Sequence, residues 1–225
     1  MFCKDSDFVD IDALRNSKRE EIETYYANLN WTVHAKPIIR SEAKRFECEV
    51  QEKLAAKIFL TVLSDEKDSI STQETIYGDS ITISFGSRPL PCKPTVLGSG
   101  VTGATLVEKG PALVFSCAFN GSVGAFIYPQ ETDYSHPSRK AYMISAWRNS
   151  REFNKSDIRR IFKLFTQVYL FGSSYISSKK TAKIYAVLEA KHLQITEGKN
   201  AIISYLLYLK YLINGLRKIY GVAKP

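Results

Sequence analysis

Asparagine and glycine at positions 120 and 121 separate two apolar segments, and this pattern limits the fold more than any other feature of the chain. Residues 112–119 (ALVFSCAF) and 123–128 (VGAFIY) flank the pair. Asn-Gly is a preferred sequence for the two central residues of a type I′ turn, in which both residues adopt positive φ angles. The sequence therefore predicts an antiparallel hairpin with a tight turn centred on Asn120 and Gly121.

Three further segments have the patterning of strands. Residues 81–85 (ITISF) alternate in polarity, residues 104–107 lead into a turn at 108–111, and residues 141–147 (AYMISAW) follow the hairpin. Alternation with period two is typical of a strand with one buried face. The connections are too short for crossover helices, so we expect a meander of about five antiparallel strands.

The segment before the predicted sheet has helical patterning. Asp10 or Asp12 can cap a first helix, residues 28–31 are expected to break it, and Ser41 can cap a second helix that runs to about Leu63. In the first helix, one face carries the apolar residues Leu14, Ile22, Tyr25 and Leu29.

Helical patterning returns after the predicted sheet. Asn154 or Ser156 can cap one helix, Ser177 or Ser178 can cap the next, and a last helix is expected between Thr196 and Tyr220. The predicted fold class is therefore α+β, an antiparallel meander of about five strands packed against N-terminal and C-terminal helices.

Length and composition are those of a globular protein with a core of its own. The chain has 225 residues, 44% of them apolar, and we expect one α+β domain over 1–225. A sub-division into a helix-plus-sheet part (1–150) and a basic helical part (151–225) is the alternative. The first residues contain no apolar core of a signal peptide. The four cysteines are scattered, which predicts reduced thiols and a cytoplasmic location. They are Cys3, Cys48, Cys92 and Cys117.

Charge is distributed unevenly along the chain. Residues 1–150 carry 17 basic and 19 acidic side chains, whereas residues 151–225 carry 14 basic and only 4 acidic ones. A concentration of positive charge attracts phosphate backbones or acidic protein surfaces. The sequence therefore predicts a non-enzymatic binding or regulatory protein that engages nucleic acid or an acidic protein partner.

The predicted binding residues lie on the C-terminal helices. Lys155, Arg159 and Lys163 follow one another at intervals of four residues, which places them along one helical stripe. The complete predicted set for nucleic acid or an acidic partner is Lys155, Arg159, Arg160, Lys163, Lys179, Lys180, Lys183, Arg217 and Lys218.

The last predicted helix has a wide apolar face. Of residues 201–220, 14 are apolar, but the longest uninterrupted apolar run is five residues, far too short to span a membrane. Such a face needs cover from the core, from a second copy of the chain or from a membrane surface. The predicted interface residues are Leu206, Leu209, Leu212, Ile213 and Leu216.

Catalytic motifs are weak. The glycines in 98–104 match G-x-G-x-x-G-A, but the short segment before Gly110-Pro111 leaves no room for the helix that must follow a dinucleotide-binding loop. Glu189-Ala-Lys191 resembles half of a metal-dependent nuclease site, but the nearest upstream acid that could share the metal, Asp157, lies 32 residues earlier on a predicted helix. We therefore expect no cofactor and no metal. One alternative is a metal-dependent hydrolase or nuclease with an unassigned site, with the Gly86–Gly103 segment as a lid, a binding loop or a plain insertion. The other is a peripheral membrane or oligomerising protein that uses the last amphipathic helix.

Overall fold

The computed structural model describes residues 11–54, 56, 58–63, 79–90, 107–118, 120–132, 137–173 and 178–198. The helical elements are α1 (Ile11–Asn30), the π-helical turn η1 (Trp31–Ala35), α2 (Lys36–Leu54), the 3₁₀ turn η2 (Ser150–Glu152), α3 (Lys155–Phe171) and α4 (Lys179–Thr196). The strands are β1 (Ile58–Leu63), β2 (Ser80–Phe85), β3 (Arg88–Pro89), β4 (Val107–Glu108), β5 (Ala112–Cys117), β6 (Val123–Tyr128) and β7 (Tyr142–Trp147).

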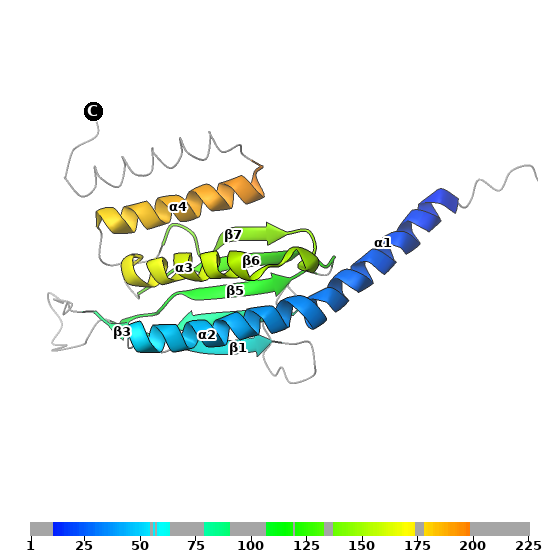
Figure 1. Cartoon of the computed structure of the whole chain (residues 1–225). Coiled ribbons are helices and arrows are strands. Elements are labelled where there is room, and N and C mark those ends of the chain that lie inside the picture. Colours follow the sequence, from blue (N-terminus) through cyan, green and yellow to red (C-terminus); the bar gives the residue numbers. More distant parts are fainter. Residues whose placement is uncertain are drawn as a thin grey trace, which may run out of the picture.

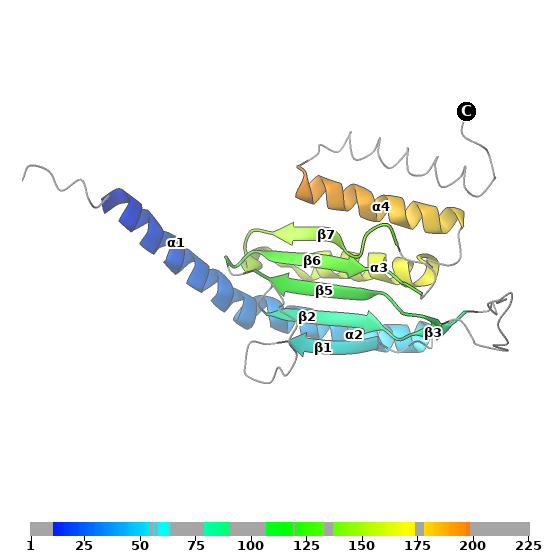
Figure 2. The ribbon, with the colours of Figure 1, turned by 180° about the vertical axis from the view of Figure 1, so that it is seen from behind.

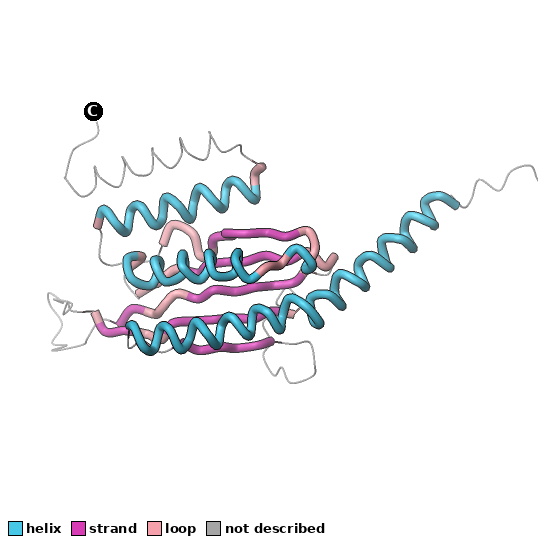
Figure 3. The backbone as a smooth tube through the Cα atoms, viewed as in Figure 1, coloured by secondary structure: helices cyan, strands magenta, loops and turns pink. Residues whose placement is uncertain are grey.

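The main sheet is an antiparallel meander, as the sequence predicts. Its strand order is β1-β2-β5-β6-β7, which is the order along the chain once the short β3–β4 ribbon is set aside (Figure 1, Figure 3). Every pairing is antiparallel, and a bulge interrupts the β6–β7 register between Ala125 and Phe126. The α+β fold class is therefore confirmed.

Helices cover one face of this sheet. The α2 and α3 helices lie across it, and α4 runs beside the edge strand β7 (Figure 1). From behind, the sheet stands in front of these helices, and no helix of the described residues lies over its other face (Figure 2). None of the helices in the described ranges combines the length and apolarity that a membrane span requires.

The core fills the space between the sheet and the helices. In β2, Ile81, Ile83 and Phe85 are buried against the helices, whereas Thr82 and Ser84 on the other face are partly exposed. Aromatic rings join the layers: Phe46 of α2 stacks on Phe162 of α3 with centroids 4.6 Å apart, and Phe85 stacks on Tyr169 of α3 at 3.9 Å. Residues from both the N-terminal and the C-terminal part of the chain thus share one core.

The α1, η1 and α2 segments form one continuous helical rod, so the predicted break at residues 28–31 is wrong. Lys36 N–H donates to Trp31 O, which is the i+5 pattern of a π-turn. Trp31 and Ala35 are buried in this turn, and their burial outweighs the weak helix propensity of the preceding asparagines. Ser41 lies inside α2 and does not cap it.

The predicted second helix is too long, because α2 ends at Leu54 and residues 58–63 form strand β1. This segment pairs along its whole length with β2, from Ile58↔Phe85 to Leu63↔Ser80. A short apolar run fits a buried helix as well as a strand, so periodicity alone does not separate the two.

The predicted strand at 104–107 is also wrong in its pairing. Its described part, β4, pairs with β3 in a separate two-stranded ribbon and forms no hairpin with β5. Strand β5 pairs instead with β2, for example through Ser84↔Ala112. Residues 91–106, which include most of the Gly86–Gly103 segment, lie outside the described residues.

The β5–β6 hairpin is confirmed, but its turn differs from the predicted type I′. Gly121 N–H donates to Ala118 O, and Ala118 N–H donates to Ser122 O. Gly121 has φ +76°. This is the pattern of a longer turn closed by a left-handed glycine bulge. The turn is fixed in place because the Gly121 Cα lies against Ala27 of α1, where a Cβ atom would clash with the Ala27 Cβ.

Candidate functional site

The α3 helix presents one apolar and one basic side. Asn154 caps it, as predicted, by accepting a hydrogen bond from Asp157 N–H. The apolar side is buried and contains Ile158, Ile161, Phe162, Phe165 and Val168. Lys155, Arg159 and Lys163 lie exposed on the other side, so the predicted basic stripe is present on the surface.

Two of the four predicted cations on α3 are already in ion pairs. Arg159 binds Glu42 of α2 with both ends of its guanidinium group, Nε to Oε2 at 2.7 Å and Nη2 to Oε1 at 3.0 Å. The hydrogen bonds from Arg159 lower the pKa of Glu42, although burial of the carboxylate opposes this. Arg160 lies 3.4 Å from Asp157. Within the described ranges, Lys155 and Lys163 have no acidic group at ion-pair distance.

The α4 helix adds a second group of cations. Ser178 caps the helix, as predicted, by accepting a hydrogen bond from Thr181 N–H. Lys179, Lys180 and Lys183 follow in the first two turns, all exposed, and the Lys180 ammonium lies 4.8 Å from the centre of the Phe171 ring. In Figure 1, α4 runs beside α3 in the opposite direction.

A groove between α3 and α4 brings Arg160 and Lys191 together. Its volume is about 240 Å³, and Ile144, Ser145, Asp157, Ile161 and Leu164 complete its lining. The other half of the nuclease-like motif, Glu189, points elsewhere: both of its carboxylate oxygens accept hydrogen bonds from Arg139 Nε, at 3.0 and 3.1 Å. Among the described residues, no three His, Cys, Asp or Glu side chains are grouped closely enough to hold a metal ion.

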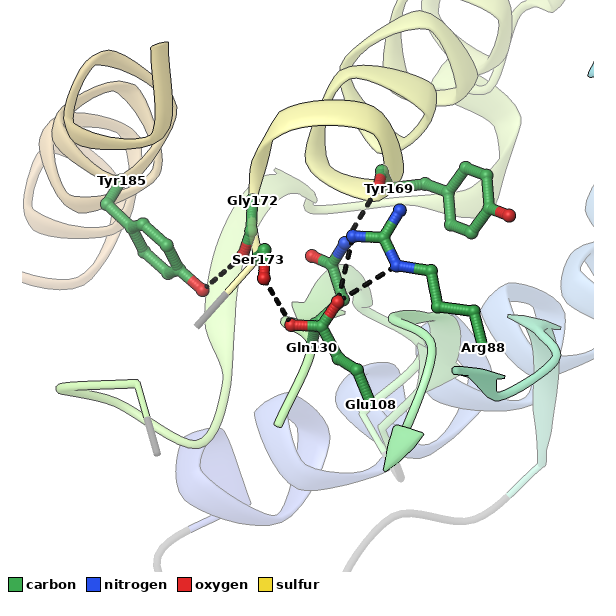
Figure 4. Close-up of polar contacts among 7 residues, drawn as sticks. All are labelled: Arg88, Glu108, Gln130, Tyr169, Gly172, Ser173 and Tyr185. Atoms are coloured by element: carbon green, nitrogen blue, oxygen red, sulfur yellow. Dashed lines mark hydrogen bonds and ion pairs between the residues drawn. The ribbon is translucent and has the colours of Figure 1, made fainter. Parts of the chain in front are cut away.

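A buried carboxylate, which the sequence analysis missed, lies at the end of α3 (Figure 4). Glu108 of β4 is fully buried. Its Oε2 accepts hydrogen bonds from Arg88 Nε at 2.9 Å and Nη2 at 2.8 Å, and its Oε1 accepts one from Ser173 Oγ at 2.7 Å. These bonds tie the β3–β4 ribbon to the segment that follows α3.

Neighbouring polar contacts hold the same segment. Gln130 Nε2 donates to Tyr169 O at 2.8 Å, and Tyr185 Oη donates to Gly172 O at 2.9 Å (Figure 4). Arg88 also lies over the Tyr169 ring, 5.2 Å from its centre. A cavity of about 250 Å³ borders the cluster and is lined by Arg88, Pro89, Leu90, Leu170, Phe171, Ser173, Ser178 and Thr181.

The contacts of Glu108 with Arg88 and Ser173 have a structural role, because they join the β3–β4 ribbon to the segment after α3. Both carboxylate oxygens of Glu108 accept hydrogen bonds from Arg88 and Ser173, so the group is already engaged as an acceptor. A general base must instead accept a proton from a substrate. Arg88 and Glu108 lie directly opposite each other in the β3–β4 ribbon. Nothing in the sequence indicates that Ser173 joins this pair.

Several predicted residues fall outside the described part of the chain. These are the basic residues Arg217 and Lys218 and the interface residues Leu206, Leu209, Leu212, Ile213 and Leu216. The described candidate site therefore consists of the basic side chains of α3 and α4.

Comparison with known proteins adds no assignment. The chain matches no protein-family model, no curated protein and no solved structure. Its function must be argued from its own residues.

Proposed function

We propose that this protein is a non-enzymatic binding protein whose α3–α4 surface engages nucleic acid. The observation that supports this proposal is the charge of the two helices, which carry eight Lys or Arg side chains and two acidic ones. The two acidic side chains are the less exposed members of their ion pairs: Asp157 is 31% exposed against 79% for Arg160, and Glu189 is 21% exposed against 41% for Arg139. The basic members of these two ion pairs are therefore more accessible to a partner than the acidic members.

The aromatic side chains indicate which kind of nucleic acid fits. Single strands are bound by stacking their bases on exposed aromatic rings. Phe162, Phe165 and Tyr185 are buried, Tyr169 is stacked on Phe85, and Phe171 lies under Lys180. The described parts of α3 and α4 thus offer charge without a stacking platform, which favours sequence-independent contacts to the phosphates of a duplex.

The described acid and base groups do not favour the hydrolase alternative. Glu108 is engaged by Arg88 and Ser173, and Glu189 is engaged by Arg139. His192 Nδ1 accepts a hydrogen bond from the Met143 backbone. An acidic protein partner remains the alternative occupant of the basic surface. A cytoplasmic location is part of this proposal, in keeping with the free thiols of Cys48 and Cys117.

The proposal is tested by the salt dependence of duplex binding to the full chain. We expect affinity for a labelled duplex to fall as the salt concentration rises. The slope of log affinity against log salt concentration should flatten by about 0.9 for each phosphate contact removed. The test variant replaces four lysines with glutamine: Lys155→Gln, Lys163→Gln, Lys180→Gln and Lys183→Gln.

A matched control removes four positive charges from other exposed positions. It combines Arg40→Gln, Lys44→Gln, Lys53→Gln and Arg148→Gln, so that both variants have the same net charge. We expect the control to keep the wild-type slope. Equal losses of duplex affinity in both variants would mean that binding depends on the total charge of the protein and not on the α3–α4 surface. Retention on heparin without duplex binding would assign the surface to an acidic protein.

A further inference from the structure

Strand β1 forms one edge of the main sheet, and in the described part of the chain no other strand pairs with its outer side. The strand order β1-β2-β5-β6-β7 ends at β1 and at β7, and Figure 2 shows β1 along the lower border of the sheet. At the opposite edge, α4 lies beside β7, and His192 accepts a hydrogen bond from the Met143 N–H. Among the described elements, none covers the outer side of β1 in this way (Figure 1).

The hydrogen bonds of β2 show which backbone groups of β1 point to this open edge. Phe85 N–H donates to Pro111 O at 3.0 Å, so the odd-numbered residues of β2 bond to β5. Bonding direction alternates along an antiparallel strand, so the even-numbered residues of β2 bond to β1, where their partners are odd-numbered. The N–H and C=O groups of the even-numbered residues of β1 therefore point outward. We call these three the outward residues of β1: Ile58, Leu60 and Val62.

The β1 strand lacks the features that usually protect a sheet edge. Its sequence, IFLTVL, contains no charged residue and no proline, and its pairing with β2 runs without a bulge. Charges, prolines and bulges are common protective features, because the unpaired N–H and C=O groups of an edge strand attract another strand. The outward residues of β1 present three donors and three acceptors in an extended row, and this row specifies a β-strand as its partner.

A second copy of β1 meets this requirement. In an antiparallel pair with Leu60 opposite Leu60, Ile58 of each copy lies opposite Val62 of the other. All the outward residues of β1 then form bonded pairs, three pairs that exchange two hydrogen bonds each. The same register sets the two Phe59 side chains diagonally across the axis, about 7–8 Å apart, which is within reach of aromatic rings. Phe59 is 54% exposed in the single chain and becomes covered in the pair.

The charges of α2 favour the same arrangement. The helix lies along β1 (Figure 1, Figure 2), and Glu42 on one side of it binds Arg159 of α3. At about 100° per residue, four exposed side chains lie within about 40° of the direction opposite Glu42, on the side of the open edge. These are Arg40, Lys44, Glu47 and Gln51, which we call the α2 flank.

Two-fold pairing through β1 sets the two α2 flanks against each other in antiparallel order. The basic half of each flank, Arg40 and Lys44, then faces the half of the other flank that carries Glu47, whereas parallel order would place like charges together. Exposed ion pairs of this kind contribute little to affinity, so neutral substitutions in the flank have small effects. Their main effect is to favour one direction of pairing.

We propose that β1 is a homodimer interface in which two copies pair edge to edge, centred on Leu60, and form one antiparallel sheet. Opposite residues of an antiparallel pair point to the same face, so the helices of both copies lie on one side of this sheet. The α1 helix projects away from the β1 edge and leaves it open (Figure 1, Figure 2). This inference goes beyond the proposed function, and the dimer would present two basic α3–α4 surfaces on the same side.

The first test measures the mass of the full chain by sedimentation equilibrium, without nucleic acid. We expect a dimer whose dissociation constant rises at least about thirty-fold in Phe59→Glu, which removes the aromatic contact and places like charges near the axis. Tyr128→Glu is the matched control, because Tyr128 is 41% exposed and lies three strands away in the same cross-strand row, Phe59–Ser84–Ala112–Tyr128. It should leave the mass unchanged. A wild-type monomer, or a dimer weakened equally by both substitutions, would overturn the proposal.

The second test follows the backbone of the wild-type protein and needs no variant. Amide hydrogen exchange at the outward residues of β1 should slow as the protein concentration rises through the dissociation constant of the dimer. The alternate amides of β1, at residues 59, 61 and 63, bond to β2 and should stay protected at every concentration. A dimer in which exchange at the outward residues does not depend on concentration pairs through another surface, and this result would overturn the proposal.

The third test exchanges the charges of the α2 flank. One variant makes the flank acidic (Arg40→Glu, Lys44→Glu), and another makes it basic (Glu47→Lys, Gln51→Lys). Each variant alone sets like charges against each other across the axis, whereas a mixture of the two sets opposite charges together. We therefore expect the mixed dimer to be at least about tenfold tighter than either variant alone. Equal affinities for the mixed dimer and the two separate variants would overturn the proposed arrangement.

Discussion

His192 of α4 accepts a hydrogen bond through Nδ1 from the backbone N–H of Met143 in β7, at a distance of 3.1 Å. Strand β7 is the last strand of the sheet, so no further strand pairs with this N–H group. Exposed edges of this kind invite pairing with other chains, and proteins commonly cover them. The helix α4 covers this edge, and Arg139, just before β7, binds Glu189 of the same helix.

This contact makes stability depend on pH. Nδ1 can accept the bond only while the imidazole is neutral. Burial, and to a lesser degree the positive charge of Arg139, lowers the pKa of His192 below its ordinary value of 6.5, although Glu189 and Glu197 oppose the shift. The unfolded chain then binds a proton more readily than the folded chain. We expect the free energy of unfolding to be maintained above about pH 6.5 and to fall as the pH drops below it, measured by urea denaturation.

His192→Gln is the control for the pH prediction. The glutamine carbonyl oxygen can accept the same bond from Met143 and does not titrate. Its stability should therefore change less than that of the wild type between pH 7 and 5.5. Parallel profiles for the two proteins would show that some other group causes the loss.

Gly121 is the second position for which a definite effect on stability is expected. The backbone there has a positive φ of +76°, and a Cβ atom would clash with the Ala27 Cβ. We expect Gly121→Ala to lower the free energy of unfolding by about 2–4 kcal/mol, from left-handed strain of about 1–2 kcal/mol and from overpacking. Urea denaturation measures the loss.

Two further variants separate these causes. Gly198 has φ +59° and nothing within 4 Å of its missing Cβ atom, so Gly198→Ala reports left-handed strain alone, about 1–2 kcal/mol. Adding Ala27→Gly to Gly121→Ala should recover the overpacking part. Equal losses in Gly121→Ala and Gly198→Ala would mean that the contact with Ala27 is soft.

The sequence predicts features that are encoded locally. The β5–β6 hairpin, the caps at Asn154 and Ser178, and the exposed stripe of α3 all follow from short spacings and side-chain chemistry. The turn type at Asn120-Gly121 was wrong because the type I′ preference is statistical, whereas the actual turn is also shaped by its contact with α1. The predicted helix over the β1 segment is wrong because the strand character of this segment depends on pairing with β2, whose partner residues lie 17 to 27 positions further along.

Other features depend on distant residues and carry no local signal. Arg159 and Glu42 are 117 positions apart, so the sequence gives no indication that half of the predicted α3 cations already have acidic partners. Ser173 and Glu108 are 65 positions apart. The exposure of Leu14, Ile22, Tyr25 and Leu29 on α1 is a third case, because an amphipathic helix has the same pattern whether or not its apolar face packs on its own body.

The Arg88–Glu108 pair yields a prediction about the core. Arg88→Met removes the cation that donates two hydrogen bonds to the fully buried Glu108 carboxylate, and we expect a loss of about 3–5 kcal/mol in the free energy of unfolding. The double variant Arg88→Met/Glu108→Met removes the buried charge as well and should recover most of that loss. Urea denaturation of the two single variants and the double variant gives the coupling between the residues. Additive losses would show that the two side chains are energetically independent.

The Glu42–Arg159 pair connects the fold to the proposed function. Glu42 is only 7% exposed, whereas Arg159 is 52% exposed and lies on the basic stripe of α3. Glu42→Gln removes the negative charge that holds the guanidinium group and leaves Arg159 available to a phosphate. We therefore expect tighter binding of a duplex, with a salt dependence steeper by about 0.9 log units, the contribution of one more phosphate contact. Glu47→Gln removes the same charge from an exposed position of α2 and should leave the slope unchanged. An unchanged slope in Glu42→Gln would mean that Arg159 takes no part in binding and serves only to join α2 to α3.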